Sequence, residues 1–207
     1  RRHALHDAVD RNLRAGGIDL GISANQGAYI GAVDYHRHTG VHARDYTAHF
    51  DCPMELSEAQ RDKLVNKLNS FLPKEIVVFS ILPVADDAHA RFDAIDRTYR
   101  YYVNIRKDAF SFPYAYRVFE KLDVEKMNEA AKYLCGEHDF KSFCQANAQV
   151  LSTVRTLYSA EVEKRGNEIV IRVCGNGFLY NMVRIMTGTL LEMTPENMAL
   201  ALGSADV

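Results

Sequence analysis

The sequence lacks a long hydrophobic run, paired cysteines and a basic excess, and each absence argues against a class of protein. No apolar stretch approaches the roughly 18–20 residues that a membrane-spanning helix needs, so no membrane association is expected. The first residues are charged and histidine-rich, unlike the apolar segment of a secretory signal. The four cysteines are scattered without a CxxC pair, which argues against a disulfide framework and predicts a reducing, cytoplasmic location.

The missing basic excess argues mildly against nucleic-acid binding, but the local charge pattern points the other way. The formal net charge is −2. Between Arg97 and Lys107, however, the chain has four basic residues, no acid and interleaved tyrosines. The cations could contact phosphates while the rings stack on bases. The alternative, which the pattern alone favours, is a strand with buried tyrosines and solvated charges.

Hydrophobic periodicity predicts alternating helices and strands without an internal repeat, and the 47% hydrophobic content is enough for a substantial core. The predicted helices are His3–Arg14, a segment opened by a capping box at Ser57, a segment from Asp123 to Gly136, Phe178–Met193, and a short helix near Thr194. The predicted strands are Tyr29–Val33, Thr47–Phe50, the buried Glu75–Leu82, Arg97–Ile105, and the hairpin of Leu157–Glu163 with Glu168–Val173. The alternation predicts an α/β or α+β fold with mixed sheets.

A histidine cluster raises the hypothesis of a metal site. His36 and His38 would share one face of a strand, and His42 could reach them across the turn at Gly40. Structural zinc takes four protein ligands, and catalytic zinc takes three plus water. No carboxylate or cysteine is evidently placed to complete such a set, so a metal-dependent enzyme stays a minor alternative.

Five segments, taken in chain order, resemble the motifs of the tRNA pseudouridine synthase A family. Thr39–Ala43 with Ala48–Asp51 resembles the end of its GRTDxGVHA…HF segment, Leu68–Pro73 its LNxxLP, His89–Tyr101 its HARFxAxxRxYxY, Asp139–Phe143 its DFxSF, and Phe178–Arg184 its FLxxMVR. The ordered set is far more specific than any single match, so the chain is identified as a member of this family.

The resemblance implies an α+β pseudouridine synthase fold in which two similar mixed α/β halves with antiparallel sheets flank a central RNA-binding cleft. It implies an N-terminal half with the catalytic loop over residues 1–105 and a C-terminal half over residues 106–207, without the family's first and last strands. It further implies a homodimer that isomerises uridine to pseudouridine in the anticodon stem-loop of tRNA. No metal or organic cofactor is implied.

That reaction breaks the bond between uracil and ribose, turns the base and joins C5 to C1′. It needs a carboxylate, a group that keeps the carboxylate ionised, and an aromatic platform for a base that has left the stack. By position in the motifs, Tyr99 would stack near the base and Arg184 would pair with the carboxylate. Phe143 would support the cleft wall. The expected RNA-binding residues are Arg37, His42, Arg97, Arg100 and Asn181.

One position departs from the family pattern. Ungapped alignment of Thr39–Ala43 puts His38 in the slot of the catalytic aspartate, and an imidazole has no negative charge to stabilise a cationic C1′. Asp34 and Asp45 are nearby, but neither has the family spacing. Two explanations stay open. Either the letters of residues 15–38 are misassigned in an active enzyme, which the intact motifs favour, or the chain is an inactive tRNA-binding relative without the nucleophile.

Overall fold

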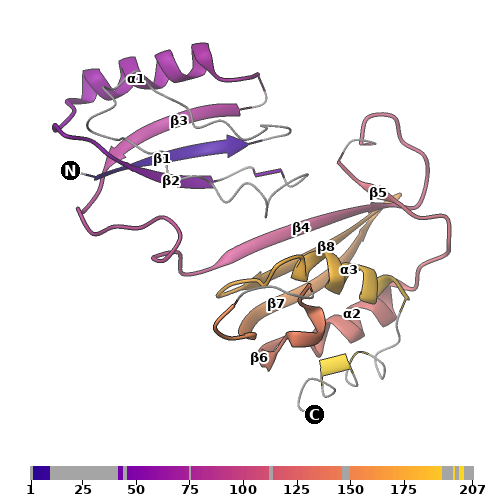
Figure 1. Cartoon of the computed structure of the whole chain (residues 1–207). Helices are drawn as coiled ribbons and strands as arrows, with labels where there is room; N and C mark the ends of the chain where they lie inside the picture. The colour runs from indigo at the N-terminus through magenta and orange to yellow at the C-terminus, as the bar shows by residue number, and fades with distance from the viewer. Residues whose placement is uncertain are drawn as a thin grey trace. The chain divides into compact units, whose positions relative to one another are not determined.

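The computed structural model describes residues 2–9, 42–43, 46–74, 76–111, 114–145, 150–192, 198 and 201–202 (Figure 1). The chain divides into two compact units, Arg1–Ala94 and Ile95–Val207. The division expected from the sequence placed the strand at 97–105 in the first half, whereas this strand belongs to the second unit. Within the described ranges, no helix is long and apolar enough to cross a membrane.

The first unit combines a three-stranded antiparallel sheet with one helix. Strands β1 (Arg2–Val9), β2 (Tyr46–Asp51) and β3 (Ile76–Pro83) are ordered β2-β1-β3, so that β1 pairs with both neighbours. Helix α1 (Glu58–Phe71) contacts β3 (Figure 1). The strand predicted at Thr47–Phe50 is therefore confirmed as β2, and the strand predicted at Tyr29–Val33 lies outside the described residues.

The helix predicted at His3–Arg14 is wrong over residues 2–9, which form β1. The prediction rested on apolar residues repeating every four positions. That spacing places residues on one face of a helix and equally on one face of a strand, so it does not distinguish the two. Pairing with strands on both sides supplies backbone hydrogen bonds that the local pattern does not reveal.

Helix α1 begins at the predicted capping box and covers one face of β3. The Ser57 amide donates to Gln60 Oε1 at 2.8 Å. The small core beneath the helix consists of Phe50, Cys52, Leu68, Val78 and Ile81. At the edge of β3, the Asn69 side-chain amide donates to the Val78 carbonyl at 2.8 Å and accepts from the Val78 amide at 2.7 Å.

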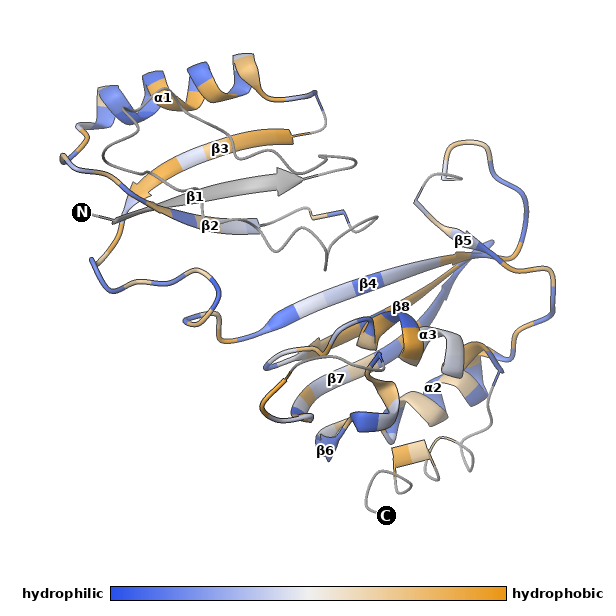
Figure 2. Cartoon of the chain, in the orientation of Figure 1, coloured by the Kyte–Doolittle hydropathy of each residue, from blue (hydrophilic) through white to orange (hydrophobic). Residues whose placement is uncertain are grey.

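Strand β3 is buried on one face only, whereas the sequence predicted a strand buried on both faces. Ile76, Val78 and Ile81 are buried, but Val77 and Phe79 on the other face are exposed. The run is hydrophobic over most of its length (Figure 2), and a continuous apolar run predicts burial on both faces. In the structure, helix α1 packs against this strand, and it is the face carrying Val78 and Ile81 that enters the core.

The second unit is built on a mixed five-stranded sheet of order β5-β4-β8-β7-β6. Its strands are β4 (Arg97–Asn104), β5 (Tyr116–Arg117), β6 (Gly136–Asp139), β7 (Val154–Arg165) and β8 (Glu168–Gly175). Only the β4–β5 pair is parallel. The predicted strand at Arg97–Ile105 and the predicted hairpin are confirmed, and Gly166 takes a φ of 63° in the hairpin turn.

Helices α2 (Val124–Lys132) and α3 (Met182–Glu192) pack over this sheet, with a 3₁₀ turn at Lys141–Phe143 (Figure 1). Asp123 caps α2 as predicted, since its Oδ1 accepts from the Lys126 amide at 3.2 Å. The helix predicted from Phe178 begins only at Met182. Asn181 has a φ of 57°, and this left-handed conformation prevents the helix from starting earlier.

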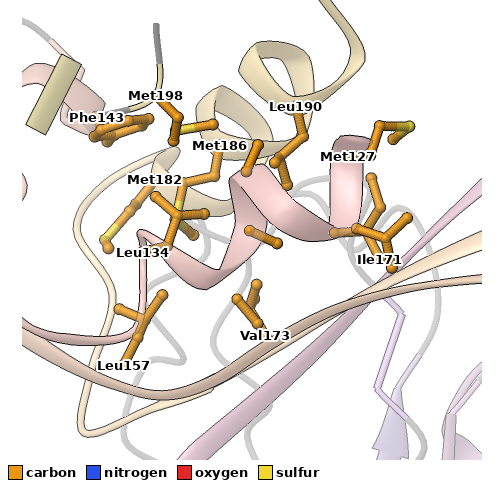
Figure 3. Packing of buried hydrophobic residues seen from close by; sticks show 14 of the residues in the cluster. Met127, Leu134, Phe143, Leu157, Ile171, Val173, Met182, Met186, Leu190 and Met198 are labelled. Atoms are coloured by element: carbon orange, nitrogen blue, oxygen red, sulfur yellow. The ribbon is translucent and has the colours of Figure 1, made fainter. Parts of the chain in front are cut away.

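The core of the second unit lies between α2, α3 and the sheet (Figure 3). Leu134, Met182 and Leu190 are 0% exposed. Figure 3 shows Met186 and Leu190 of α3 on one side of α2, and Ile171 and Val173 of β8 on the other. The unit is thus a mixed α/β domain with its own core, and the turn after β8 is anchored to it through α3.

The turn after β8 depends on a close backbone approach at Gly175. A Cβ added there would lie 2.7 Å from the Thr156 carbonyl oxygen, whereas a Cβ added at Gly188 of α3 would meet nothing within 4 Å. Gly175→Ala is expected to lower the free energy of unfolding by about 1–3 kcal/mol, because the backbones must separate. Gly188→Ala is expected to raise it by about 0.5–1 kcal/mol, since alanine favours a helix. Urea denaturation of both variants measures this, and equal shifts would contradict the close approach.

Candidate active site

Strand β4 presents Tyr99 and Tyr101 to one side of the sheet and Arg100 to the other. Tyr99 and Tyr101 pack against the core of the second unit, and Tyr99 is paired across the strands with Val173. Arg100 is exposed and lies opposite Arg172 of β8. Since neighbouring strand residues point to opposite faces, the structure does not bring Arg100 and Tyr99 together. The inward, partly buried Tyr99 and Tyr101 agree with the interpretation as a strand with tyrosines inside, and RNA contact by this segment stays a prediction.

Tyr99 contacts the segment that leads into α3. Its ring meets the Phe178 ring edge to face, with centroids 5.1 Å apart and an interplanar angle of 84°. The contact joins the β4 motif to the Phe178–Arg184 motif, which are far apart in the sequence. Both rings of this aromatic corner are partly buried.

A short turn at Asn176 holds Phe178 in place. The Asn176 amide donates to the Thr156 carbonyl at 3.0 Å, and Asn176 Oδ1 accepts from the Thr156 amide at 3.0 Å. Arg97 Nη1 donates to the Asn176 carbonyl at 2.9 Å. Arg97 was predicted to bind RNA. In the structure at least one of its donors fixes this turn, which ties β4 and β7 to the start of α3.

Asn181 and Arg184 lie at the beginning of α3. The Asn181 carbonyl accepts from the Ile185 amide at 3.0 Å, and its side-chain amide donates to Gln145 Oε1. The predicted RNA contact at Asn181 therefore also has a structural role in starting the helix. Arg184 is exposed in the first turn of α3, which contains no acidic residue.

The electrostatics at this helix start favour an anion. The amino-terminal end of a helix carries a partial positive charge, and Arg184 adds a full one. A cation in the first turn is locally unfavourable unless a negative group lies nearby. A carboxylate or phosphate placed against Arg184 would be stabilised by both the guanidinium and the helix dipole.

Burial changes the acidity of the Tyr99 phenol. Desolvation raises the pKa of Tyr99 above its ordinary value of 10.0, and the positive charge of Arg97 opposes the shift only in part. The phenol is therefore neutral throughout the physiological range. It remains a hydrogen-bond donor and an uncharged stacking surface.

The remaining predicted residues belong to the first unit, and most of them lie outside the described residues. Arg37 and His38 lie outside the described residues, as do His36, Asp34 and Asp45. His42 is half-buried in the first unit. The described residues contain no group of three or more histidine, cysteine or acidic side chains that could hold a metal, but two of the three clustered histidines are not among them.

Two further aromatic residues of the second unit, Phe143 and Phe178, have different surroundings. Phe143 is 2% exposed in the core of the second unit, and its support of a cleft wall stays a prediction. The contact of Phe178 with Tyr99 was not predicted, nor was the bridge at Asn176. The Asn176-Gly177 pair was a signal for a turn, but the sequence does not indicate which backbone the asparagine side chain would bridge.

Comparison with known proteins gives consistent matches. A family model described as tRNA pseudouridine synthase matches residues 130–202. Three proteins, each named tRNA pseudouridine synthase A, are similar to this chain. The one from Listeria monocytogenes is 42% identical over 176 residues, covering 81% of this chain and 70% of that protein. The one from Bacillus licheniformis is 45% identical over 157 residues, covering 75% and 62% respectively. The one from Brevibacillus brevis is 47% identical over 156 residues, covering 74% and 63%. The chain thus spans less than two thirds of the length of the latter two relatives.

The raised pKa of Tyr99 predicts a specific alkaline titration. As pH rises past 10.0, unfolded tyrosine loses its proton while folded Tyr99 keeps it, so the contribution of Tyr99 to stability is full below that pH and is lost above it. The difference between the ultraviolet phenolate titrations of the wild-type and Tyr99→Phe proteins should show one tyrosine with a midpoint above 10.0. A midpoint at or below that value in the folded protein would contradict the burial.

Proposed function

We propose, because this chain belongs to the tRNA pseudouridine synthase A family, that it isomerises uridine to pseudouridine in the anticodon stem-loop of tRNA. The observation that supports the proposal most directly is the Tyr99–Phe178 contact, which links the strand motif to the arginine-bearing helix. The further proposals are those the family resemblance carries. They are two similar halves flanking an RNA-binding cleft, a homodimer, and a cytoplasmic location.

In the proposed reaction, Tyr99 holds the base while it is detached from the ribose. The bond from N1 to C1′ breaks, the bond from C5 to C1′ forms, C5 loses a proton and N1 gains one. Atoms and oxidation state are unchanged, so the reaction requires no external oxidant or reductant and no cofactor is proposed. A neutral, partly buried phenol suits this role, because an ionised ring would be harder to keep in a desolvated site.

Arg184 is proposed to hold the catalytic carboxylate in its charged form. The carboxylate must stay ionised to act at C1′, and an arginine within salt-bridge distance lowers the pKa of an acid. The partial positive charge at the start of α3 would also stabilise the ionised carboxylate. His38 occupies the aspartate slot in the ungapped alignment, so the motif does not identify the residue that supplies this carboxylate.

The RNA itself is proposed to be held mainly through its phosphates. Arg100 lies exposed on the open face of the sheet, and Arg37 and His42 belong to the catalytic loop by resemblance. Phosphate contacts of this kind position the RNA without reading its sequence. Their number sets how steeply binding weakens as salt is added.

The proposed activity is tested by incubating the protein with tRNA labelled in its uridines and measuring pseudouridine. We expect pseudouridine in the anticodon arm, and none in a transcript whose anticodon-arm uridines are replaced by cytidine. Tight, salt-sensitive tRNA binding without any pseudouridine at stoichiometric protein would instead identify an inactive relative. If the protein neither binds tRNA nor forms pseudouridine, both interpretations are contradicted.

Arg184→Ala should remove turnover while leaving tRNA binding almost intact. The loss of a preorganised charge at the reacting centre typically lowers the rate by about 10²–10³-fold. An exposed charge contributes only about 0.2–1 kcal/mol to binding, so affinity should change by less than about fivefold. Single-turnover kinetics and equilibrium binding separate the two effects. The matched control is Arg165→Ala, which removes an exposed arginine paired with Glu163 at 2.7 Å and should leave turnover unchanged.

A further inference from the structure

Residues His89–Asp93 of the first unit form a tight turn that is closed at both ends. The His89 amide donates to Asp93 Oδ2 at 2.6 Å, and the Asp93 amide donates back to the His89 carbonyl at 2.9 Å. His89 Nδ1 accepts from the Arg91 and Phe92 amides at 3.2 and 3.3 Å. The hydrogen bonds of these residues therefore fix the direction in which the turn points.

The same turn is fastened to strand β2. The Ala90 amide donates to His49 Nδ1 at 3.3 Å, and the rings of His49 and His89 lie with centroids 4.3 Å apart. Both histidines are half-buried. Two motifs of the sequence, the one ending in His49-Phe50 and the one beginning at His89, thus meet in a single structure to which the proposed reaction gives no role.

The side chain that this structure holds outward is an aromatic ring. Phe92 is 74% exposed, although its backbone amide donates to both Nδ1 and the carbonyl oxygen of His89. Its ring lies 4.2 Å from the His89 ring, and the Arg91 guanidinium is 5.6 Å from its centroid. Keeping a phenylalanine in water on a rigid turn contributes nothing to the core. An exposed ring on a turn whose backbone is fixed by hydrogen bonds is suited to contact a ligand, because little conformational freedom is lost on binding.

We infer that the His89–Asp93 turn is a docking element for RNA, in which Phe92 stacks on an unpaired nucleobase and Arg91 contacts the adjoining phosphate. The inference rests on the proposed function in taking RNA as the ligand. It adds a second contact to the platform at Tyr99. The ligand class is an unpaired nucleotide of RNA.

The chemistry of the pair favours RNA over a protein partner. Aromatic rings beside arginine are the usual surface for unstacked bases, because every base has a π-face and the cation is attracted to the backbone. A protein contact of similar strength would call for a wider apolar patch. Here the exposed ring is flanked instead by the Arg91 guanidinium and the His89 imidazole.

The inference is tested by equilibrium binding of the complete chain to a fluorescently labelled tRNA. Phe92→Ala should weaken binding by about five- to 150-fold, the range found when one base–aromatic stack is removed. Phe92→Tyr keeps the ring and should bind almost as the wild type does. The matched control is Phe110→Ala, which removes a phenylalanine that is 93% exposed in the other unit and should leave the affinity unchanged.

Each outcome separates this inference from the proposed function. If the wild type makes pseudouridine and Phe92→Ala binds tRNA normally, the docking element is wrong and the function stands. If binding depends on the Phe92 ring but no pseudouridine forms, the docking element stands and the function fails. If Phe92→Ala alters the oligomeric state in sedimentation without altering tRNA affinity, the ring contacts a second copy of the chain and the inference is overturned.

Discussion

The candidate site depends on the close approach of two backbones where β8 ends beside β7. Gly175 admits the Thr156 carbonyl oxygen, and Asn176 then bonds to both backbone groups of Thr156. This double bridge sets the direction in which the chain leaves the sheet. It places Phe178 against Tyr99 and starts α3 so that Arg184 falls in its first turn. The positions of the Phe178 ring and the Arg184 guanidinium therefore depend on the contact of Gly175 and Asn176 with the Thr156 backbone.

The sequence predicts well those elements whose signals are local. The capping box at Ser57, the cap at Asp123 and the turn at Gly166 each involve residues only a few positions apart. Elements fixed by distant partners are predicted less well. The strand at residues 2–9 shares its apolar spacing with a helix, and only its two neighbouring strands decide between them. The late start of α3 follows from the backbone of Asn181, which no periodicity indicates.

For the site, the motifs identify residues but not their neighbours. Tyr99 and Arg184 are selected by position in two motifs, and a chain of contacts through Phe178 links these motifs in the structure. The opposite orientation of Arg100 was deducible, because adjacent residues of a strand alternate between faces. The hydrogen bond from Arg97 to the turn was not, since it joins residues 79 positions apart. The resemblance thus supplies a set of side chains, and the fold determines which of them can act together.

The side chain of Asn69 has a consequence for solubility. Strand β3 is an edge strand of its sheet, and an exposed edge strand offers its backbone amide and carbonyl groups to any other extended chain. The exposed face of β3 also bears Val77 and Phe79, whose burial would stabilise such pairing between chains. By bonding to both backbone groups of Val78, the asparagine imitates a neighbouring strand for one residue. The edge of the sheet is thereby blocked at Val78, and this disfavours aggregation by pairing of β3 with strands of other chains.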